Sequence, residues 1–307
     1  MTAETPLENG PEPVIPDGQT GQFRSGFVAV VGRPNVGKST LANALVGQKV
    51  AITSAKPETT RRQIRGIVNR ENYQVVLVDT PGLHRPRTLL GERLNDLVRD
   101  ALADVDAALV CLPADQAVGP GDKFLLGCLP DGLPRVAAVT KIDRVKRPAV
   151  AEKLTQLDEL ADWSALVPVS AKAADGIGRL ETVLADLMPP GPRWYQDGEV
   201  TDEPLAMRIA ELVREAALQD VRQELPHSVA VVVDELELPR IRVSLFVERD
   251  SQKGIIIGVK GARLRRIGVA ARSQIETLVG RKIFLEIHVK VAKEWQRDPK
   301  ALAKLGF

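Results

Sequence analysis

The sequence Gly32-Arg33-Pro34-Asn35-Val36-Gly37-Lys38-Ser39 follows a short, wholly apolar run over residues 27–31. Its spacing fits G-x-x-x-x-G-K-[ST], a phosphate-binding loop. The apolar run is typical of a strand buried on both faces of a parallel sheet, and a helix is expected to begin near Lys38. In that setting the glycines let backbone N–H groups turn inward around a phosphate, and the helix adds its positive end. The stretch therefore predicts an α/β domain that binds a phosphorylated ligand.

The residues of this loop have separate predicted roles. We expect Lys38 to reach the β- and γ-phosphate oxygens of a nucleotide, and the Ser39 hydroxyl to ligate Mg²⁺. Nucleotide contacts are expected along the whole stretch from Gly32 to Thr40. A chance glycine-rich turn is the alternative, but the strand before the loop and the helix after it argue against that reading.

Three further polar motifs each follow an apolar run. They are Asp79-Thr80-Pro81-Gly82, Thr140-Lys141-Ile142-Asp143 and Ser170-Ala171-Lys172. Ligands of open α/β sheets bind at the carboxyl ends of the strands, which is where all three motifs fall. Each match is weak alone, whereas their order along the chain makes them strong together.

The chemistry of these motifs favours a guanine nucleotide. We expect Asp79 to hold Mg²⁺ through a water molecule and the Gly82 N–H to bind the γ-phosphate. The Asp143 carboxylate can accept both N1–H and N2–H₂ of guanine, a pair of donors that adenine lacks in that arrangement. The Ala171 N–H is expected to donate to guanine O6. The motifs together predict a GTP site.

Alternating apolar runs and helical patterns define the first domain. Apolar runs recur at 75–78, 107–112, 135–139 and 166–169, and helical patterns at 41–46, 89–102, 150–160 and 177–187. This order predicts a mostly parallel sheet with helices on both faces. Pro189-Pro190-Gly191-Pro192 ends it, because neither a helix nor a central strand accommodates that sequence. We place the domain at residues 26–192, after a proline-rich tail at 1–25 expected to be disordered.

A second, smaller unit follows an expected linker at residues 193–203. It combines an amphipathic helix at 204–221, strands at 228–236 and 240–248, a glycine-containing helical stretch at about 255–279 and a strand at 282–291. The order α-β-β-α-α-β indicates an α+β domain, placed at 204–292, with a C-terminal tail at 293–307. From Arg240 onward there are 16 Lys and Arg against 6 Asp and Glu, while the rest has 26 against 34. Such a basic end indicates a polyanionic partner, nucleic acid first and an anionic membrane surface second.

The glycine-containing stretch holds a G-x-x-G sequence between two helical patterns. In KH domains such a loop clamps about four nucleotides of single-stranded backbone. Bare glycine lets two helix ends approach the phosphates. A helix-breaking turn is the alternative, but the charge balance and the order of elements favour a type II KH domain. The predicted RNA-binding residues are Gly258, Val259, Lys260, Gly261, Arg263, Arg265 and Arg266, although the arginines also fit a solvated helix face.

The segment Pro57-Glu58-Thr59-Thr60-Arg61 lies between the loop helix and the second strand of the first domain. With the motifs above, it resembles the translation-factor-like GTPases. In that family a Thr of this mobile loop closes over the γ-phosphate and completes the Mg²⁺ shell. The resemblance favours Thr60 over Thr59, although both also fit a simple turn cap. It implies catalytic roles for Lys38, Thr60, Gly82 and Asn35, and metal contacts for Ser39, Thr60 and Asp79.

Several positions bear on how hydrolysis proceeds. Many GTPases place a water-orienting Gln where this chain has Leu83, so we expect slow basal turnover. In several relatives with a hydrophobic residue there, an Asn matching Asn35 helps to hold a K⁺ ion in place of an arginine finger. Asn35 also fits a local turn. Thr140 stands where Asn is more common, so we expect a weaker nucleotide contact, and His84 is interpreted as a solvated loop residue.

A GTPase with a Thr-Thr-Arg segment and a C-terminal type II KH domain resembles the Era family, over about residues 27–307. The resemblance includes Gly119-Pro120-Gly121-Asp122 and Trp295-Gln296-Arg297-Asp298-Pro299. It implies binding of GTP, GDP and Mg²⁺, GTP hydrolysis, and binding of the 3′ end of small-subunit (16S) rRNA. It also implies that the chain assists assembly of the pre-30S particle and contacts the inner face of the cell membrane peripherally. We expect a monomer.

Three alternatives stay open at this point. The chain is also compatible with a constitutive RNA-binding protein that uses its nucleotide domain as a scaffold, with a membrane-docked GTP switch, and with an RNA-modification GTPase. The last needs an exposed cysteine of low pKa, and neither Cys111 nor Cys128 has such a setting. Two cysteines, no secretion-signal pattern and no apolar run approaching the ~18 residues of a membrane span indicate the cytoplasm.

Overall fold

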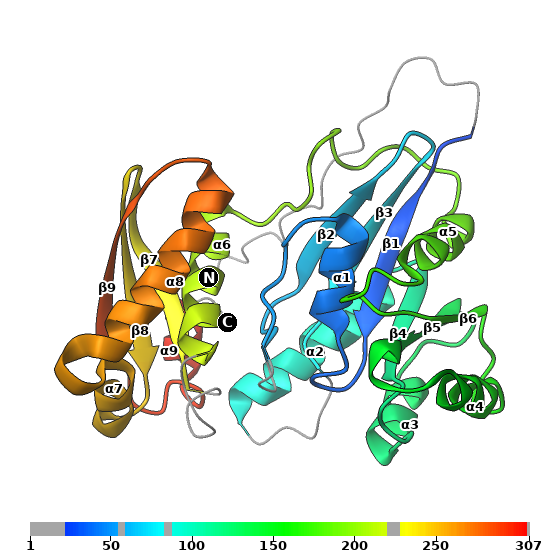
Figure 1. Ribbon diagram of the computed structural model, residues 1–307, viewed down its shortest axis with the longest axis horizontal. Coiled ribbons are helices and arrows are strands. Elements are labelled where there is room, and N and C mark those ends of the chain that lie inside the picture. The colour runs from blue at the N-terminus through cyan, green and yellow to red at the C-terminus, as the bar shows by residue number, and fades with distance from the viewer. Residues whose placement is uncertain (1–21, 55–58, 83–87, 220–227, 306–307) are drawn as a thin grey trace, which may run out of the picture.

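A computed structural model describes residues 22–54, 59–82, 88–219 and 228–305 (Figure 1). The expected disordered tail falls almost entirely on residues 1–21, which lie outside the described residues. The described chain forms two lobes, each built around its own sheet. Within these four ranges, no helix combines the length and the apolar character needed to cross a membrane.

Six strands form the sheet of the first lobe, in the order β2-β3-β1-β4-β5-β6. Their bounds are β1 Arg24–Val31, β2 Ile64–Asn69, β3 Tyr73–Asp79, β4 Ala107–Pro113, β5 Arg135–Thr140 and β6 Ala165–Pro168. β2 runs antiparallel to β3, and the other pairings are parallel. This arrangement confirms the mostly parallel sheet predicted from the apolar runs. β1 begins at Arg24, two residues before the expected start of the domain.

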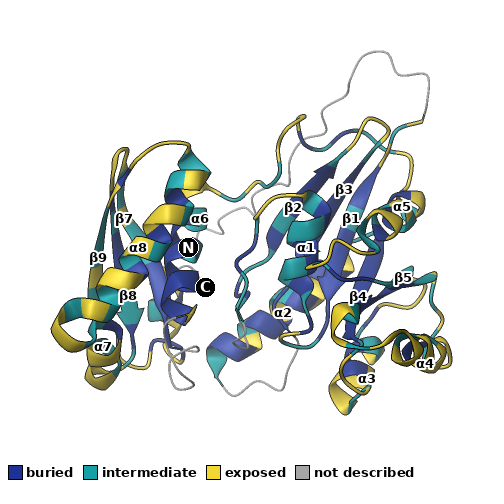
Figure 2. Cartoon of the chain, in the orientation of Figure 1, coloured by how far each residue is buried: buried dark blue, intermediate teal, exposed yellow. Residues whose placement is uncertain are grey.

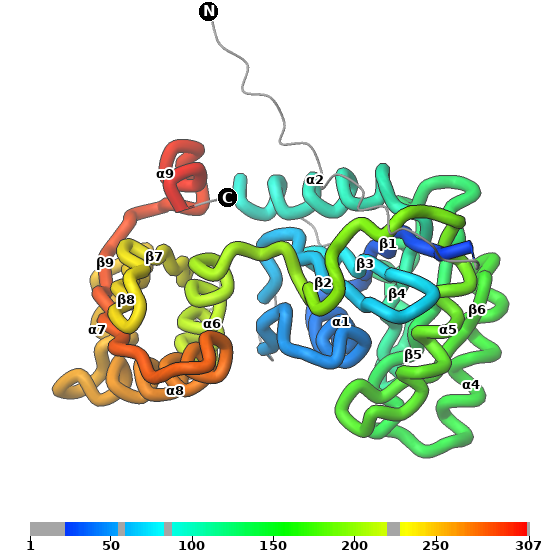
Figure 3. The backbone as a smooth tube through the Cα atoms, turned by 90° about the horizontal axis from the view of Figure 1, so that it is seen from above, coloured from blue at the N-terminus to red at the C-terminus, as the bar shows by residue number. Residues whose placement is uncertain are grey.

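Helices cover both faces of this sheet, with α2 on one side and α1 and α5 on the other (Figure 3). The helices are α1 Lys38–Val46, α2 Leu89–Ala103, α3 Pro120–Gly127, α4 Arg147–Asp158 and α5 Ile177–Leu187. Apolar residues of α1 and α5 share one core with the sheet. Residues of α2, α3 and α4 form the core on the opposite face. The buried strands between exposed outer helix faces are visible in Figure 2.

The second lobe has the predicted order of elements. It comprises α6 Leu205–Gln219, β7 Ala230–Glu237, β8 Arg240–Val247, α7 Asp250–Ile257, α8 Ala262–Val279 and β9 Phe284–Val291. β7 and β8 are antiparallel, and β9 runs parallel to β8 at the edge of the sheet. Alternating apolar residues such as Ile241, Val243 and Leu245 pack one sheet face against α6 and α8. The α+β arrangement predicted for this part is confirmed.

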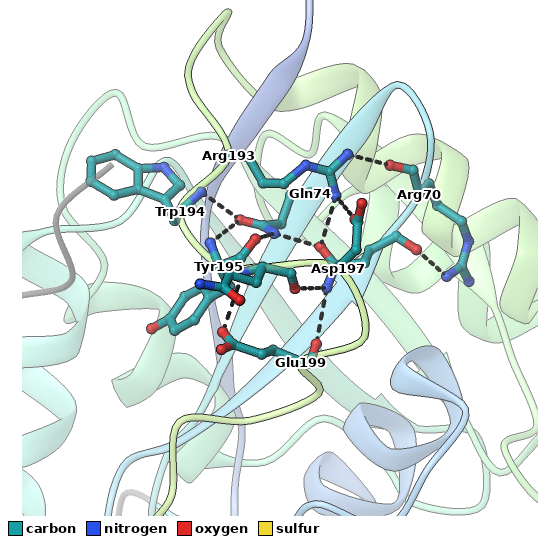
Figure 4. Close-up of polar contacts among 9 residues, drawn as sticks. Arg70, Gln74, Arg193, Trp194, Tyr195, Asp197 and Glu199 are labelled. Carbon is teal, nitrogen blue, oxygen red and sulfur yellow. Dashed lines mark hydrogen bonds and ion pairs between the residues drawn. The ribbon is translucent and has the colours of Figure 1, made fainter. Parts of the chain in front are cut away.

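The segment between the lobes is bound to the first sheet (Figure 4). Gln74 of β3 is fully buried, and its side-chain oxygen accepts the N–H groups of Trp194 and Tyr195. The same side chain donates to the carbonyl of Tyr195 at 2.9 Å. Further along, the N–H of Ile67 in β2 donates to the carbonyl of Val200 at 2.9 Å. Residues 194–200, expected to be a linker, therefore lie along the β2 edge of the first sheet.

Residues 293–305, expected to be a tail, pack between the lobes instead. Trp295 is fully buried, and α9 Pro299–Lys304 follows it beside one end of α2 (Figure 3). The indole N–H of Trp295 donates to the carbonyl of Ser228 at 3.2 Å. We define the interdomain core as the buried residues Leu90, Leu94, Ala230, Trp295, Leu302 and Leu305. This core joins α2 of the first lobe to β7 of the second through the C-terminal segment.

Candidate nucleotide and RNA sites

A cavity of about 560 Å³ opens at the carboxyl ends of the parallel strands. Residues of all four predicted motifs line it, together with the stretch 52–54. The predicted residues among its walls are Pro34, Asn35, Gly37, Lys38, Ser39, Thr40, Thr60, Gly82, Thr140, Lys141, Asp143, Ala171 and Lys172. The structure thus brings together side chains that lie up to 138 positions apart in the chain, from Pro34 to Lys172. The cavity is large enough to hold a nucleotide-sized ligand.

The phosphate end of the cavity is formed by the loop after β1 and the first turn of α1. Gly37, with φ 108°, precedes the helix, and the first turn of α1, whose N–H groups have no partner within the helix, lines the cavity. The ammonium group of Lys38 is buried and donates to the carbonyls of Gly32 and Arg33, each at 3.0 Å. Burial lowers the pKa of Lys38, and the nearby Asp79 carboxylate opposes that effect. This arrangement holds a positive charge where phosphate oxygens would lie.

Three predicted metal contacts meet beside this lysine. The Ser39 hydroxyl donates to Asp79 Oδ2 at 2.7 Å, and the hydroxyls of Ser39 and Thr60 lie 2.9 Å apart. Burial raises the pKa of Asp79 to about 6. Its other oxygen, Oδ1, is buried and accepts no hydrogen bond within the described part of the chain. A buried carboxylate oxygen beside two hydroxyls is the oxygen donor set that Mg²⁺ prefers, so these residues fit the ion.

The base end of the cavity is formed by the loops after β5 and β6. Asp143 Oδ1 accepts a hydrogen bond of 2.6 Å from the Ser170 hydroxyl, and this bond lowers the pKa of Asp143. The carboxylate is therefore held in the ionised form that can accept two N–H donors. Thr140 donates to the carbonyl of Val36 at 2.6 Å and so contacts the phosphate-binding loop. Lys141 likewise donates to the carbonyl of Asn35 at 2.6 Å.

Other predicted nucleotide residues turn their side chains away from the cavity. Arg33 forms an ion pair of 2.7 Å with the buried Asp122 at the start of α3. The Thr80 hydroxyl donates to the carbonyl of Val30, and Val36 lies in the core. Gly32, Asp79, Pro81 and Ser170 do not line the described cavity, although Asp79 and Ser170 bond to the lining residues Ser39 and Asp143. The predicted positions Pro57, Glu58, Leu83 and His84 lie outside the described residues.

Asn35 lies at a turn in the cavity wall. Its backbone has φ 63°, in the left-handed region that Asn tolerates better than most residues, and it also lines the cavity. Gly82 approaches the same loop closely, because an added Cβ would lie 2.8 Å from the backbone nitrogen of Pro34. The loop after β3 therefore contacts the phosphate-binding loop directly.

The G-x-x-G sequence forms the turn between α7 and α8. Gly258 has φ 71° and ψ 178°, Lys260 has φ 48° and Gly261 has φ 75°, so three of its four residues have left-handed φ values. Val259 is 82% exposed at the tip. Arg263, predicted to contact RNA, instead donates to the carbonyl of Ile255 at 2.6 Å in the last turn of α7. The turn therefore presents backbone, Val259 and Lys260 to solvent.

A groove of about 380 Å³ extends from this turn between α8 and β9. Of the predicted RNA-binding residues, Gly261 and Arg265 line it, whereas Arg266 is exposed on α8. The lining also includes residues not predicted as contacts, namely Leu264, Gly268, Val269, Arg272, Leu285 and Ile287. The spacing of 261, 265, 268 and 272 on one helix face is the signal that could have identified the α8 side. The groove lining is largely aliphatic and contains no aromatic residue among the described residues, so RNA bases could contact it by apolar packing rather than by ring stacking.

Comparison with known proteins connects these two sites to one family. A model of the 50S ribosome-binding GTPase family matches residues 27–141, and a KH domain model matches residues 224–296. GTPase Era of Mycolicibacterium smegmatis is 58% identical over 297 residues, which is 93% of this chain and 99% of that protein. The chain belongs to the Era family of GTPases.

Two solved Era structures share this fold. Aquifex aeolicus Era bound to GDP and AlF4⁻, in a variant form, aligns with a TM-score of 0.87 and 33% identity, covering 92% of this chain and 99% of that one. Era in complex with MgGDPNP and nucleotides 1506–1542 of 16S rRNA aligns with a TM-score of 0.87, 34% identity and the same coverage. The resemblance to the Era family is confirmed, as are the GTPase and KH fold assignments.

The cysteine that an RNA-modification GTPase would need is not offered by Cys111. That thiol is fully buried, and burial raises its pKa to about 12, so it stays protonated. Membership of the Era family removes the same alternative on independent grounds.

Proposed function

We propose that this Era-family GTPase binds the 3′ end of small-subunit rRNA and assists assembly of the 30S ribosomal subunit in a GTP-dependent cycle. The observation that carries the proposal is the Era complex solved with both MgGDPNP and 16S rRNA, which shares the fold over 92% of this chain. The cavity lined by the predicted phosphate- and base-binding residues, and the groove beside the G-x-x-G turn, support the proposal.

The predicted site residues have definite roles in this proposal. Lys38 neutralises charge on the β- and γ-phosphates, and Asp143 selects guanine. Ser39 and Thr60 ligate Mg²⁺, and Asp79 holds it through water. Bound Mg²⁺ supplies positive charge against the charge that develops on the transferring phosphoryl group. The Gly82 N–H binds the γ-phosphate.

Coupling between nucleotide and RNA rests on the contacts between the lobes. Thr60 turns toward Asp79, and its neighbour Arg61 turns the other way into the second lobe. The buried Arg61 guanidinium donates to the carbonyl of Val229 at 2.7 Å and lies 5.7 Å from the centroid of the Trp295 ring. The N–H of Leu90 in α2 donates to the carbonyl of Gln296 at 3.1 Å. A nucleotide that moved the Thr60–Arg61 segment or the start of α2 would therefore alter the packing of the KH domain.

The test measures the affinity for a 16S 3′-end RNA fragment with GDPNP, with GDP and without nucleotide. We expect the three affinities to differ, because Arg61 beside Thr60 and Leu90 of α2 both contact the second lobe, and a nucleotide that moves either segment would change those contacts. Equal affinities would remove the coupling. Gly258→Asp serves as the RNA-binding control, since an added carboxylate repels phosphates at the turn; it should abolish RNA binding and leave GTP binding intact.

A bound K⁺ ion at Asn35 is a further part of the proposal. Its position in the cavity wall beside the phosphate-binding loop supports it. Replacing K⁺ by Na⁺ should slow GTP hydrolysis, because the smaller ion does not fit a site selected for K⁺. Equal rates in the two salts would count against the role.

We also propose that the chain acts as a monomer in the cytoplasm, where ribosomal particles assemble, and contacts the membrane only peripherally through its basic end. Binding to anionic vesicles and to RNA can be compared as salt is raised. Only RNA binding should retain a sequence-dependent component. Vesicle binding that outlasts RNA binding would favour the membrane-docked switch.

The runner-up is a constitutive RNA-binding protein whose nucleotide domain is only a scaffold. The converging Lys38, Ser39 and Asp79 side chains favour a working nucleotide site instead. Hydrolysis of GTP by a Lys38→Ala variant at the parent's rate would favour the runner-up.

A further inference from the structure

The chain between α1 and β2 belongs to the first lobe in sequence, but it packs on α6 of the second lobe. Ile52 is 3% exposed and lies in the apolar core of the KH domain with Ile209 and Val213. In Figures 1 and 3, α6 lies on the side of the second lobe that faces this segment. Part of the segment that precedes Thr60 in the chain therefore packs on a helix outside the GTPase domain.

Glu215 of α6 holds the first end of this segment. Its side chain is 1% exposed, and Oε1 accepts the backbone N–H of Thr53 at 2.8 Å. Its other oxygen forms an ion pair with Lys49. A buried carboxylate bonded to a backbone N–H and an ammonium group is fully engaged, so Thr53 is fixed relative to α6.

Arg214, the preceding residue of α6, holds the second end. Its guanidinium is 1% exposed and donates to the backbone carbonyl of Thr59. Both oxygens of Glu211, one turn earlier, accept from the same guanidinium, which fixes its orientation. Thr59 directly precedes Thr60, whose hydroxyl lies 2.9 Å from Ser39 Oγ. The Arg214 contact is thus one peptide unit from the predicted Mg²⁺ contact.

We propose that Arg214 and Glu215 of the KH domain are positioning residues of the GTPase site: they hold both ends of the segment that carries Thr60 and so place its hydroxyl for the Mg²⁺–GTP complex. This inference rests on the proposed role of Thr60 in GTP binding. Holding a ligating segment in place before the ligand arrives reduces the ordering cost of binding. GDP lacks the γ-phosphate that recruits Thr60, so the effect is specific to the triphosphate.

The test compares the affinities of Arg214→Met and the parent for GDPNP and for GDP, with Mg²⁺ present. We expect GDPNP affinity to fall by about tenfold, the scale of one lost charge-assisted hydrogen bond, while GDP affinity stays within about twofold. Hydrolysis should slow with it. Equal affinity for GDPNP in both proteins, or an equal loss for GDPNP and GDP, would overturn the proposal.

Thr60→Ala provides a second, independent comparison. If Arg214 acts by placing the Thr60 hydroxyl, Arg214→Met should have little further effect on GDPNP affinity once Thr60 is Ala. The same tenfold loss in that background would show that Arg214 acts elsewhere and would overturn the proposal.

Matched variants control for damage to the fold. Arg208→Met removes another Arg of α6 whose side chain makes none of the bonds to residues 53–60 given above, and it should leave the GDPNP-to-GDP ratio unchanged. Arg214→Lys keeps a donor and should retain part of the ratio, which allows the test even if Arg214→Met does not fold. Glu215→Gln keeps an acceptor for Thr53 and should lower GDPNP affinity less than Glu215→Leu does. The reverse order contradicts the proposal.

The outcome separates this inference from the proposed function. A parent protein that fails to hydrolyse GTP or to bind the rRNA fragment refutes the proposed function. A parent that does both, with Arg214→Met binding GDPNP as tightly, refutes only the role of α6.

Discussion

Asp143 shows how one neighbour fixes the charge of a side chain that we propose recognises the base. Ser170, 27 positions later in the chain, donates to its carboxylate and lowers its pKa. Asp143 also lines the cavity, together with residues of the loops after β5 and β6. The pair therefore combines the charge and the orientation that two guanine N–H donors require.

Replacing this carboxylate tests the base assignment. Asp143→Asn should reduce GTP and GDP affinity by about 100-fold, because an amide nitrogen cannot accept a guanine N–H. Xanthine nucleotides should bind relatively better, since their O2 can accept from the new amide. Equilibrium titration with guanine and xanthine nucleotides measures both affinities. Asp175→Asn, at an exposed position of the neighbouring loop, is the control. Unchanged GTP affinity would refute the assignment.

The two tyrosines of the chain predict an alkaline loss of stability. Burial and a 2.7 Å hydrogen bond to Glu181 raise the pKa of Tyr73 to about 12, and burial with Asp202 raises the pKa of Tyr195. In the unfolded chain both ionise near pH 10. The folded state thus binds these protons more tightly, so stability is full below about pH 10 and falls as pH rises toward about 12.

Ultraviolet absorbance of tyrosinate measures the ionisation of both tyrosines directly. The native protein should show no tyrosinate near pH 10, whereas the denatured protein should titrate there. Tyr73→Phe, which removes one phenol, should leave only the Tyr195 signal. Native absorbance that rises with the ordinary tyrosine pKa would contradict the prediction.

At the scale of elements, the α7–α8 turn distinguishes its two glycines. Gly258 has φ 71° and ψ 178°, a region that essentially only Gly adopts, and an added Cβ would lie 2.8 Å from the Arg263 Cβ. Gly261, with φ 75°, has open space at that position. We expect Gly258→Ala to cost about 1–3 kcal/mol of stability through backbone strain, and Gly261→Ala less. Thermal unfolding of the two variants checks the order, and an equal or reversed order contradicts it.

The interdomain core makes the C-terminal segment a structural element. Trp295→Ala should lower the free energy of unfolding by about 3–5 kcal/mol, because a fully buried indole is removed between α2, β7 and α9. Trp295→Phe keeps a ring but loses the hydrogen bond to Ser228. It should lower the free energy of unfolding by about 1 kcal/mol in addition to the effect of the smaller ring. Denaturant unfolding measures both. A negligible loss for Trp295→Ala would show that the segment does not hold the lobes together.

An element could be predicted when a pattern in its own short stretch of sequence determines it. β1, β4 and β5 are continuous apolar runs, so their place in a parallel sheet was readable from sequence. β2 was harder, because the sequence of Ile64–Asn69 mixes Arg65, Gly66 and Asn69 with apolar residues and sits at the sheet edge. The C-terminal segment gave little signal, since Trp295, Leu302 and Leu305 are too widely spaced to show a helical period over a short α9.

The same reasoning applies to the site. Motif residues could be gathered into one cavity because strand ends converge at one edge of a parallel sheet. Arg33 and Arg263 could not be placed, since their orientations depend on Asp122 and on the Ile255 carbonyl, which no spacing rule connects to them. The support of Thr59 by Arg214 spans 155 positions and two domains, so only the folded chain shows it.

Across the whole molecule, the lobes contact one another at two places, one of which includes residues that line the cavity. Arg61 and the residues held by α6 lie on one side, and the interdomain core lies at the start of α2. The domains thus share contacts where a GTPase changes most between nucleotide states. These shared contacts are where the proposed coupling between nucleotide and RNA would act.

The binding of residues 194–200 along β2 has a consequence for dividing the molecule. A fragment that ends at residue 192 would keep every strand of the first sheet but would uncover the edge that Ile67 now shares with Val200. Exposed strand edges template intermolecular pairing, so such a fragment should self-associate more than the intact chain. By covering the β2 edge, the connecting peptide should therefore reduce aggregation.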